Sequence, residues 1–176
     1  MRNLLYFIFT LLICFISESS LLAQGFDQDN TLVGIGIGVG SRYTGSNIPP
    51  VGAHFEKGVA EKISVGAFAG FTSTELSDFK STIILVGGRG AYHYGNHLDL
   101  PDEWDLYGGL GIYYVNTSIK SEVRSGFGTE TGSSSSGSVD LGIFTGARYY
   151  FSDQAGVFAE LGTSLAWIQL GLALKL

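Results

Sequence analysis

The sequence predicts an all-β fold, an eight-stranded antiparallel up-and-down β-barrel that spans a membrane. Three observations support this prediction. Apolar residues recur at every second position in successive segments, the opposite face consists of glycines with a few charges, and charged residues are scarce. Of the 176 residues, 26 are glycine and 15% are charged, against about a quarter charged in typical soluble domains. The 45% hydrophobic content excludes a disordered chain, and the length suits a single domain.

Residues 1–23 are expected to be a cleaved signal peptide, which leaves 24–176 as the barrel domain. Arg2 supplies the positive start, 4–16 is an uncharged apolar run, and a polar stretch then leads to Ala23. The apolar run is too short for a membrane-spanning helix, which needs roughly 20 residues. Cleavage is predicted after Ala23, with Gly25 as the second choice. The remaining chain has no cysteine, so disulfides cannot stabilise it.

Eight segments with period-2 alternation follow, which is the pattern of half-buried strands. In the first segment, valine and isoleucine occupy alternate positions from Val33 to Val39, and glycine occupies the positions between them. Most segments are long enough for a tilted strand to cross a bilayer, which takes roughly 9–11 residues. The predicted strands are 31–40, 50–58, 63–73, 82–94, 103–116, 138–151, 155–163 and 167–176.

Most of the later strands have one clearly apolar face. The segments 82–94 and 103–116 are harder to orient, because Gly88, Gly90 and Gly108 blur the alternation. The apolar faces of the others, in chain order, are Val51/Ala53/Phe55, Ile63/Val65/Ala67/Ala69/Phe71, Val139/Leu141/Ile143/Ala147/Tyr149/Phe151, Val157/Ala159/Leu161 and Ile168/Leu170/Leu172/Leu174/Leu176.

The charges within these strands test the assignment, because a charge should avoid a face that meets lipid. Seven of the charged residues within the strands take the parity opposite to the apolar face. His54 and His93 take the same polar parity. The seven are Glu56, Arg89, Asp105, Asp140, Arg148, Glu160 and Lys175.

Alternation alone also fits a soluble secreted β-sandwich, which buries its apolar side chains between two sheets. The composition of the polar face distinguishes the two folds. A water-facing surface would carry many Lys, Glu, Thr and Ser residues, whereas this face is mostly glycine with a few aromatic residues and the charges. A narrow lumen needs small residues and charges that compensate one another, so the sequence favours the barrel.

The connections and the aromatic residues predict the orientation. With both termini in the periplasm, the connections 41–49, 74–81 and 117–137 face the exterior. The serine-rich connection 117–137 is expected to be a flexible, solvent-exposed loop. Aromatic residues then gather at the two membrane interfaces, as they do in membrane barrels. The periplasmic set is Phe55, Tyr92, Tyr94, Trp104, Tyr149 and Phe151, and the outer set is Phe71 and Tyr114.

The inward charges are expected to form a structural network in the lumen, because an unpaired buried charge is costly. Arg148 and Glu160 should pair across the hairpin centred near 153–154, with Arg89 as a third member. The pair can be interpreted as a plug of ion pairs or as a gate through a closed barrel. The predicted network comprises Arg89, Arg148, Glu160, Glu56, Lys175 and Asp140.

No catalytic, cofactor-binding or metal-ligating residue is assigned. The glycines of 34–40 lack the G-x-G-x-x-G spacing and the following helix of a dinucleotide site. His54 and Glu56 share a strand face, but no G-x-S-x-G or H-x-S pattern supplies a nucleophile. His93 with His97 lacks carboxylates at metal-ligand spacing. The net charge of −6 argues against nucleic acid as a partner.

Several stretches resemble small outer-membrane β-barrel proteins of Bacteroidota. Residues 146–162 (GARYYFSDQAGVFAELG) resemble their penultimate hairpin and 167–176 (WIQLGLALKL) their last strand, and 107–112 and 62–67 are also similar. The resemblance covers nearly all of 31–176 and extends to OmpA-like and OmpX-like barrels and to the porin family. It implies outer-membrane lipid and the barrel-assembly machinery as partners, and it supplies no catalytic residues. One departure is Leu176, where such barrels usually end in Phe.

The expected function is structural or surface-interacting, at the bacterial cell outer membrane. We expect a monomer whose lumen is plugged by side chains and ion pairs. The interior of an eight-stranded barrel is filled by its own side chains, so passive diffusion of nutrients is not expected. The alternatives are a narrow pore or transporter for ions or small hydrophobic molecules, and an enzyme. No specific ligand follows from the sequence.

Overall fold

The computed structural model describes residues 26, 28–43, 48–76, 79–98, 100–125 and 128–176, which form eight strands and one short 3-10 helix. The predicted signal peptide, 1–23, and the second cleavage position, Gly25, lie outside the described residues. The elements are β1 (Thr31–Ser41), β2 (Ile48–Ala60), β3 (Ile63–Leu76), β4 (Phe79–His93), η1 (Gly95–His97), β5 (Trp104–Ser125), β6 (Gly128–Tyr150), β7 (Ala155–Gly162) and β8 (Ala166–Lys175).

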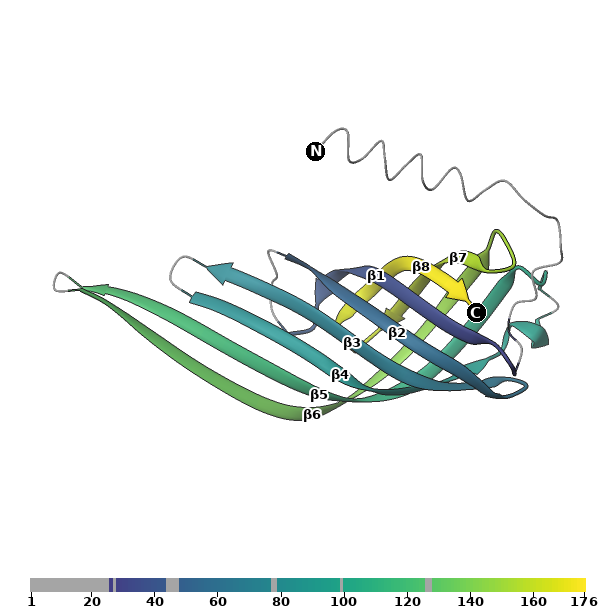
Figure 1. The fold of residues 1–176 in the computed structure, drawn as a ribbon, viewed down its shortest axis with the longest axis horizontal. Helices are drawn as coiled ribbons and strands as arrows, with labels where there is room; N and C mark the ends of the chain where they lie inside the picture. Colours follow the sequence, from purple (N-terminus) through teal and green to yellow (C-terminus); the bar gives the residue numbers. More distant parts are fainter. Residues whose placement is uncertain (1–25, 27, 44–47, 77–78, 99, 126–127) are drawn as a thin grey trace, which may run out of the picture.

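The strands close into an antiparallel barrel in which every strand pairs with its neighbours in the sequence (Figure 1). Closure is made between β1 and β8, where Ile35 faces Leu172 and Ile37 faces Leu170. A closed ladder pairs most backbone hydrogen-bonding groups between neighbouring strands, which is what a strand structure in lipid requires. The predicted barrel is therefore confirmed, and the sandwich alternative is wrong.

The predicted apolar faces point outward and the polar faces inward. Ile35 is 57% exposed and Leu141 is 71% exposed. The charged residues at the alternate positions, which point inward, are mostly buried. Glycines let neighbouring strands approach closely at some positions. A Cβ at Gly66 would collide with the carbonyl of Phe55, and one at Gly171 with the carbonyl of Ile35. Within the described residues, no helix is both long and apolar enough to cross a membrane.

The wall is much taller on one side than on the other, as Figure 1 shows. β5 and β6 run for 22 and 23 residues, whereas β7 and β8 have 8 and 10. We call the end that carries the β5–β6 hairpin the tall end. The opposite end, with the turns after Ala60 and after Tyr150, we call the short-turn end.

The prediction that 117–137 is a loop is wrong, although residues 132–137 are solvent-exposed as expected. Its described residues, 117–125 and 128–137, extend β5 and β6 in an unbroken register from Thr117 opposite Ser136 to Ser125 opposite Gly128. The expected loop 74–81 is largely strand as well, because Glu75 pairs with Lys80. The physical reason is that the strands continue beyond the part of the wall whose outer face is apolar. There both faces meet water, so polar side chains replace the apolar–polar alternation that predicted the rest of each strand.

The lumen has two layers of different character. Towards the tall end it is filled by an apolar cluster from β3, β4, β5 and the β7–β8 connection, against which Tyr43 packs. The ends of β2 and β6 near the short turns instead bring charged side chains inward, and these are described below. The apolar cluster comprises Phe68, Ile83, Leu85, Tyr113, Val115 and Leu165.

Candidate functional site: a charged cluster in the lumen

Five charged side chains from five different strands meet in the lumen. Period-2 alternation places each of them on the inner face, and none is more than 4% exposed. They are Glu56 on β2, Arg89 on β4, Asp105 on β5, Arg148 on β6 and Glu160 on β7.

Glu56 lies between the two guanidinium groups. Its Oε1 is 3.0 Å from Arg89 Nε and 3.1 Å from Arg148 Nη2. Arg89 also donates to Glu160, with Nη2 2.7 Å from Oε2, and Arg148 donates to Asp105, with Nη1 2.9 Å from Oδ2. The ion pairs thus form a continuous chain across the barrel. Charges removed from water need this many partners, because each one loses its hydration.

Aromatic rings cover the faces of both guanidinium groups. The Arg148 guanidinium lies 3.8 Å from the centre of the Tyr107 ring, and that of Arg89 lies 3.7 Å from the centre of the Phe144 ring. The Tyr107 hydroxyl also donates to Glu160 Oε2 at 3.2 Å. Stacking on an aromatic face is favourable for a desolvated cation. These inward aromatics therefore belong to the cluster.

The predicted direct pair between Arg148 and Glu160 is wrong. The β6–β7 register places Glu160 opposite Gly146, and Arg148 opposite Phe158. The long arginine side chains then reach across the lumen instead of to the neighbouring strand. Arg148 consequently pairs with Glu56 and Asp105, while Arg89 pairs with Glu160 and Glu56.

Two residues of the predicted network lie apart from this cluster. The Lys175 ammonium is 4.1 Å from the centre of the Tyr150 ring. Asp140 accepts from Arg42 Nη1 at 3.1 Å and from the Tyr43 hydroxyl at 3.1 Å, at the rim of the short wall. The structure therefore brings together Glu56, Arg89, Arg148 and Glu160 of the predicted set, and separates Lys175 and Asp140 from them.

Sequence reasoning missed a hydrogen-bonded chain that joins the cluster. His93 Nδ1 lies 2.7 Å from Asp105 Oδ1, and its Nε2 lies 2.9 Å from Ser64 Oγ. Ser64 Oγ in turn donates to Glu56 Oε2 at 3.0 Å. A signal for part of this was available, because Asp105 and Arg148 are directly opposite once the β5–β6 register is known. The inward parity of Ser64 and His93 was a weaker signal.

The hydroxyl of Ser64 links His93 to Glu56. Ser64 has a single hydroxyl proton, which it donates to the Glu56 carboxylate. One ring nitrogen of His93 lies against the Ser64 oxygen and the other against the Asp105 carboxylate. The carboxylates of Glu56 and Asp105 are thus joined through one serine and one histidine.

Phe26 closes the cluster at the short-turn end. Its ring stacks on the His93 ring, with centroids 3.5 Å apart and planes 6° apart. Phe26 is 7% exposed and packs with Leu32, Tyr150 and other lumen residues. His97, which the sequence analysis considered with His93 as a metal ligand, lies outside the cluster. Its Nε2 is 2.7 Å from the Tyr92 hydroxyl.

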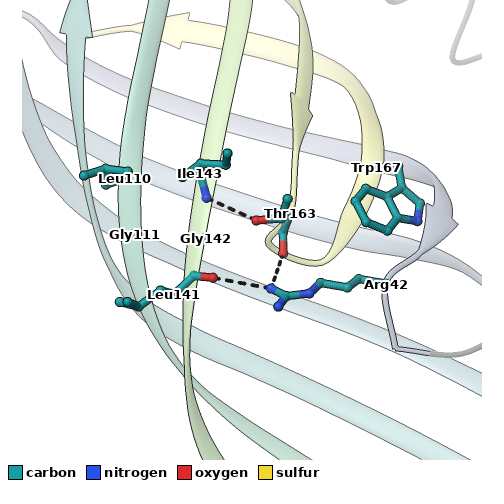
Figure 2. A pocket seen from close by; sticks show the side chains of 8 residues that line it. All are labelled: Arg42, Leu110, Gly111, Leu141, Gly142, Ile143, Thr163 and Trp167. Carbon is teal, nitrogen blue, oxygen red and sulfur yellow. Dashed lines mark hydrogen bonds between the residues drawn. The ribbon is translucent and has the colours of Figure 1, made fainter.

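A second polar group lies at the top of the short wall, where β7 ends. Arg42 Nη1 donates to the carbonyl of Thr163 at 2.8 Å and to that of Leu141 at 3.4 Å, as Figure 2 shows. These residues border a hollow of about 470 Å³ that Leu110, Ile143 and Trp167 also line. Burial, followed by the hydrogen bond and the charge of Asp140, raises the pKa of Tyr43 to about 12.

No family model matches the sequence, and no curated protein matches it. Solved structures match the fold. The N-terminal β-barrel domain of Pseudomonas aeruginosa OprF aligns with a TM-score of 0.53 at 12% identity, covering 85% of this chain and 98% of that domain. Yersinia pestis Ail, in complex with the heparin analogue sucrose octasulfate, aligns with a TM-score of 0.50 at 13% identity, covering 84% and 95%.

A designed transmembrane β-barrel also aligns, with a TM-score of 0.50 at 15% identity, covering 87% of this chain and 99% of the design. Identities this low show a common fold and nothing about shared activity. The chain therefore has the fold of the eight-stranded outer-membrane β-barrels.

Proposed function

We propose that this protein is an integral outer-membrane barrel with a surface-interaction role, exported by the signal peptide 1–23. In this proposal the tall end faces the exterior, the lumen is plugged, and the protein is no enzyme. Outer-membrane lipid and the barrel-assembly machinery are the partners that such a location implies. The resemblance to Bacteroidota barrels and to the porin family remains a prediction from sequence.

One observation carries the proposal: the outward side chains of the tall wall change character at a single level. On β5 they are Leu110, Ile112 and Tyr114, and from Asn116 upward they are polar. On β6 they are Ile143, Leu141 and Val139, and then only serine and glycine up to Ser133. The Tyr114–Val139 pair thus marks the boundary of an apolar belt. The ladder beyond it spans about 35 Å at roughly 3.3 Å per residue.

Two layers support the proposal of a plugged lumen. The ion cluster crosses the barrel at one level, and the apolar cluster around Phe68 and Tyr113 fills the next. A hydrated ion would have to break buried ion pairs and then cross a layer without polar partners. Both steps are costly.

The narrow pore remains the second candidate function, because buried polar atoms lie between these layers. His54 is 3% exposed and Gln169 is 6% exposed. Both ring nitrogens of His54, and Gln169 Nε2, have no hydrogen-bond partner in the described part of the chain. A water-filled path would satisfy such atoms.

Catalysis is not proposed, although Ser64, His93 and Asp105 share the hydrogen-bond order of a hydrolase triad. A nucleophilic serine gives its proton to the histidine. Here Ser64 donates to Glu56 instead and is fully buried. Phe26 covers the histidine on the side nearest the short-turn end.

Cysteine labelling on intact cells tests the location and the orientation. The chain after position 23 has no native cysteine, so any labelling of this part of the chain comes from the introduced cysteine. Ser135→Cys on the tall wall should react with a membrane-impermeant maleimide, and Gln154→Cys in the β6–β7 turn should react only after the outer membrane is opened. The reverse pattern would overturn the orientation, and labelling of neither in opened cells would overturn the membrane-barrel proposal.

Conductance in planar bilayers separates the plugged barrel from the pore. The purified barrel should show no steady conductance, and Glu160→Gln should leave it closed because the apolar layer is intact. Steady channels in the unmodified protein would favour the pore.

A further inference from the structure

The membrane-facing side of the barrel has a break in its wall between β6 and β7. β6 pairs with β7 only from Tyr150 to Phe144, because β7 ends at Gly162. Beyond Phe144, β6 has no strand beside it on this side in the described part of the chain. The hollow of about 470 Å³ described above lies at this break. Its volume is within the range of about 300–1,000 Å³ that is usual for small-molecule sites.

The lining of this hollow is apolar and lies just inside the apolar belt. Leu141 is the first outward residue of β6 below the boundary residue Val139, and Ile143, which pairs with Leu110, is the second. All three lining side chains are exposed on the outer face. Trp167 lies across the hollow from Leu110, as Figure 2 shows. In a membrane barrel this face meets lipid, so the hollow opens towards hydrocarbon.

A guanidinium lies at the rim of the hollow. Arg42 follows directly after β1, and its Nη1 donates to the carbonyls of Thr163 and Leu141 (Figure 2). These bonds cap backbone groups that the break leaves without a strand partner, which is favourable inside the belt. Among the described residues, no acceptor lies at Nε of Arg42. Since a guanidinium has five N–H groups, Arg42 retains donors for a further anion.

Asp140 fixes the guanidinium in this position. Its Oδ2 is 3.1 Å from Arg42 Nη1, and its Oδ1 is 3.3 Å from Nη2. Each carboxylate oxygen also accepts from another donor, Oδ1 from the Leu141 N–H and Oδ2 from the Tyr43 hydroxyl. The charges of Arg42 and Asp140 offset each other. An anion is therefore attracted by the remaining N–H groups of Arg42 and not by a net charge, so its preference for this site should be modest.

A glycine shapes the rim. Gly40 has a φ of 69°, in the left-handed region that favours glycine. A Cβ at this position would lie 3.0 Å from Cδ1 of Trp167. The end of β1 therefore passes close to the indole ring, and Arg42 follows two residues later.

We propose that the hollow binds one acyl chain of an anionic, phosphate-bearing membrane lipid, whose phosphate accepts from Arg42. The apolar lining lies below the boundary of the belt, and Arg42 contacts Asp140, the neighbour of the boundary residue Val139. A lipid presents its chain and its phosphate in the same order, and indole rings such as that of Trp167 favour this level. The inference deepens the proposed function and rests on it, because the hollow must face lipid.

The test measures how lipids quench the fluorescence of each tryptophan separately. The chain has two tryptophans, so Trp104→Phe leaves only Trp167, and Trp167→Phe leaves only Trp104, which lies at the short-turn end and is the control. Each folded variant is placed in phosphatidylcholine vesicles that contain increasing fractions of brominated-chain phosphatidic acid or brominated-chain phosphatidylcholine. Phosphatidic acid should associate about fivefold more strongly than phosphatidylcholine at Trp167, and equally at Trp104.

Two variants in the Trp104→Phe background separate the parts of the site. Arg42→Gln keeps an amide that can donate to a backbone carbonyl, but it should abolish the preference for phosphatidic acid. Ile143→Phe fills the hollow and should also abolish the preference. Its matched control is Ile35→Phe on the outer face of β1, where the isoleucine is 57% exposed against 61% for Ile143. Resistance to unfolding on unheated gels shows that each variant is folded.

Three outcomes would overturn the proposal. One is equal association of the two lipids at Trp167, and another is a preference that persists in folded Arg42→Gln or Ile143→Phe. The third is loss of the preference when inorganic phosphate is added to the buffer, which would make a water-soluble phosphate the occupant. If Arg42→Gln does not fold, the comparison of lipids at Trp167 and the Ile143→Phe variant decide.

Failure of this inference is distinguishable from failure of the proposed function. If Ser135→Cys is labelled on intact cells while Trp167 shows no lipid preference, the barrel spans the membrane as proposed and only the lipid site is wrong.

Discussion

The lumen cluster makes a quantitative prediction about which charges depend on one another. Glu160 accepts from Arg89 Nη2 at 2.7 Å, from Arg89 Nη1 at 3.4 Å and from the Tyr107 hydroxyl at 3.2 Å, and it is 3% exposed. Removing one partner of a buried ion pair costs about 3–5 kcal/mol. Because Arg89 keeps Glu56 at 3.0 Å, the free energy of unfolding should fall by about 3 kcal/mol in Glu160→Ala.

A double-mutant cycle then separates direct from indirect contact. Arg89→Met with Glu160→Met leaves neither charge of that pair, so the double variant should recover part of the loss, with a coupling free energy of about 2–3 kcal/mol. The same cycle on Arg148 and Glu160, which do not touch, should give a coupling at least about 1 kcal/mol smaller.

The assay is reversible urea unfolding in lipid vesicles, followed by the fluorescence of Trp104 and Trp167. Gln154→Ala, in an exposed turn, is the control and should leave the unfolding midpoint unchanged. If the Arg148–Glu160 coupling equals or exceeds that of Arg89–Glu160, the β6–β7 register described above is wrong and the adjacent pair expected from the sequence is right.

Three further predictions concern other parts of the barrel. Leu170→Arg, on the outer face, should lower the free energy of unfolding in lipid by roughly 2–4 kcal/mol, and an unchanged stability would mean that strand β8 faces the other way. The raised pKa of Tyr43 stabilises the fold fully below pH 10, and this contribution should be lost as the pH rises from about 10 to 12; Tyr43→Phe should lack this part of the decline in urea midpoint. His93→Leu leaves Oδ1 of the buried Asp105 carboxylate without its hydrogen-bond partner, so it should destabilise the barrel more than Asp105→Asn combined with His93→Leu, and equal stabilities would contradict the contact between His93 and Asp105.

Much of the fold follows from period 2 alone. Alternation located all eight strands, and the parity of Glu56, Arg148 and Glu160 placed them in the lumen, because a charge on the outer face would meet lipid. Alternation did not predict that β5 and β6 continue to the tall end. Above Tyr114 both faces of the hairpin meet water, so the serines of 132–137 carry no alternation and resemble a loop.

The partners within the cluster could not be read from spacing. Adjacent-strand logic predicted Arg148 with Glu160, but a two-residue offset in register and the length of the arginine side chain select a partner across the lumen. The apolar layer was missed for a related reason. Ile83 to Val86 is apolar at every position, so alternation did not reveal that Ile83 and Leu85 face inward.

The connectivity of the ion pairs has a consequence for how the barrel forms. Asp105 and Arg148 lie on one hairpin and can meet early. Glu56 needs β4 and β6, and Arg89 needs β7. A partly built sheet entering lipid would therefore expose at least one uncompensated charge, and the charge is neutralised only when the last strands arrive. Closure and insertion should for this reason be a single cooperative step, with half-closed intermediates too high in free energy to accumulate.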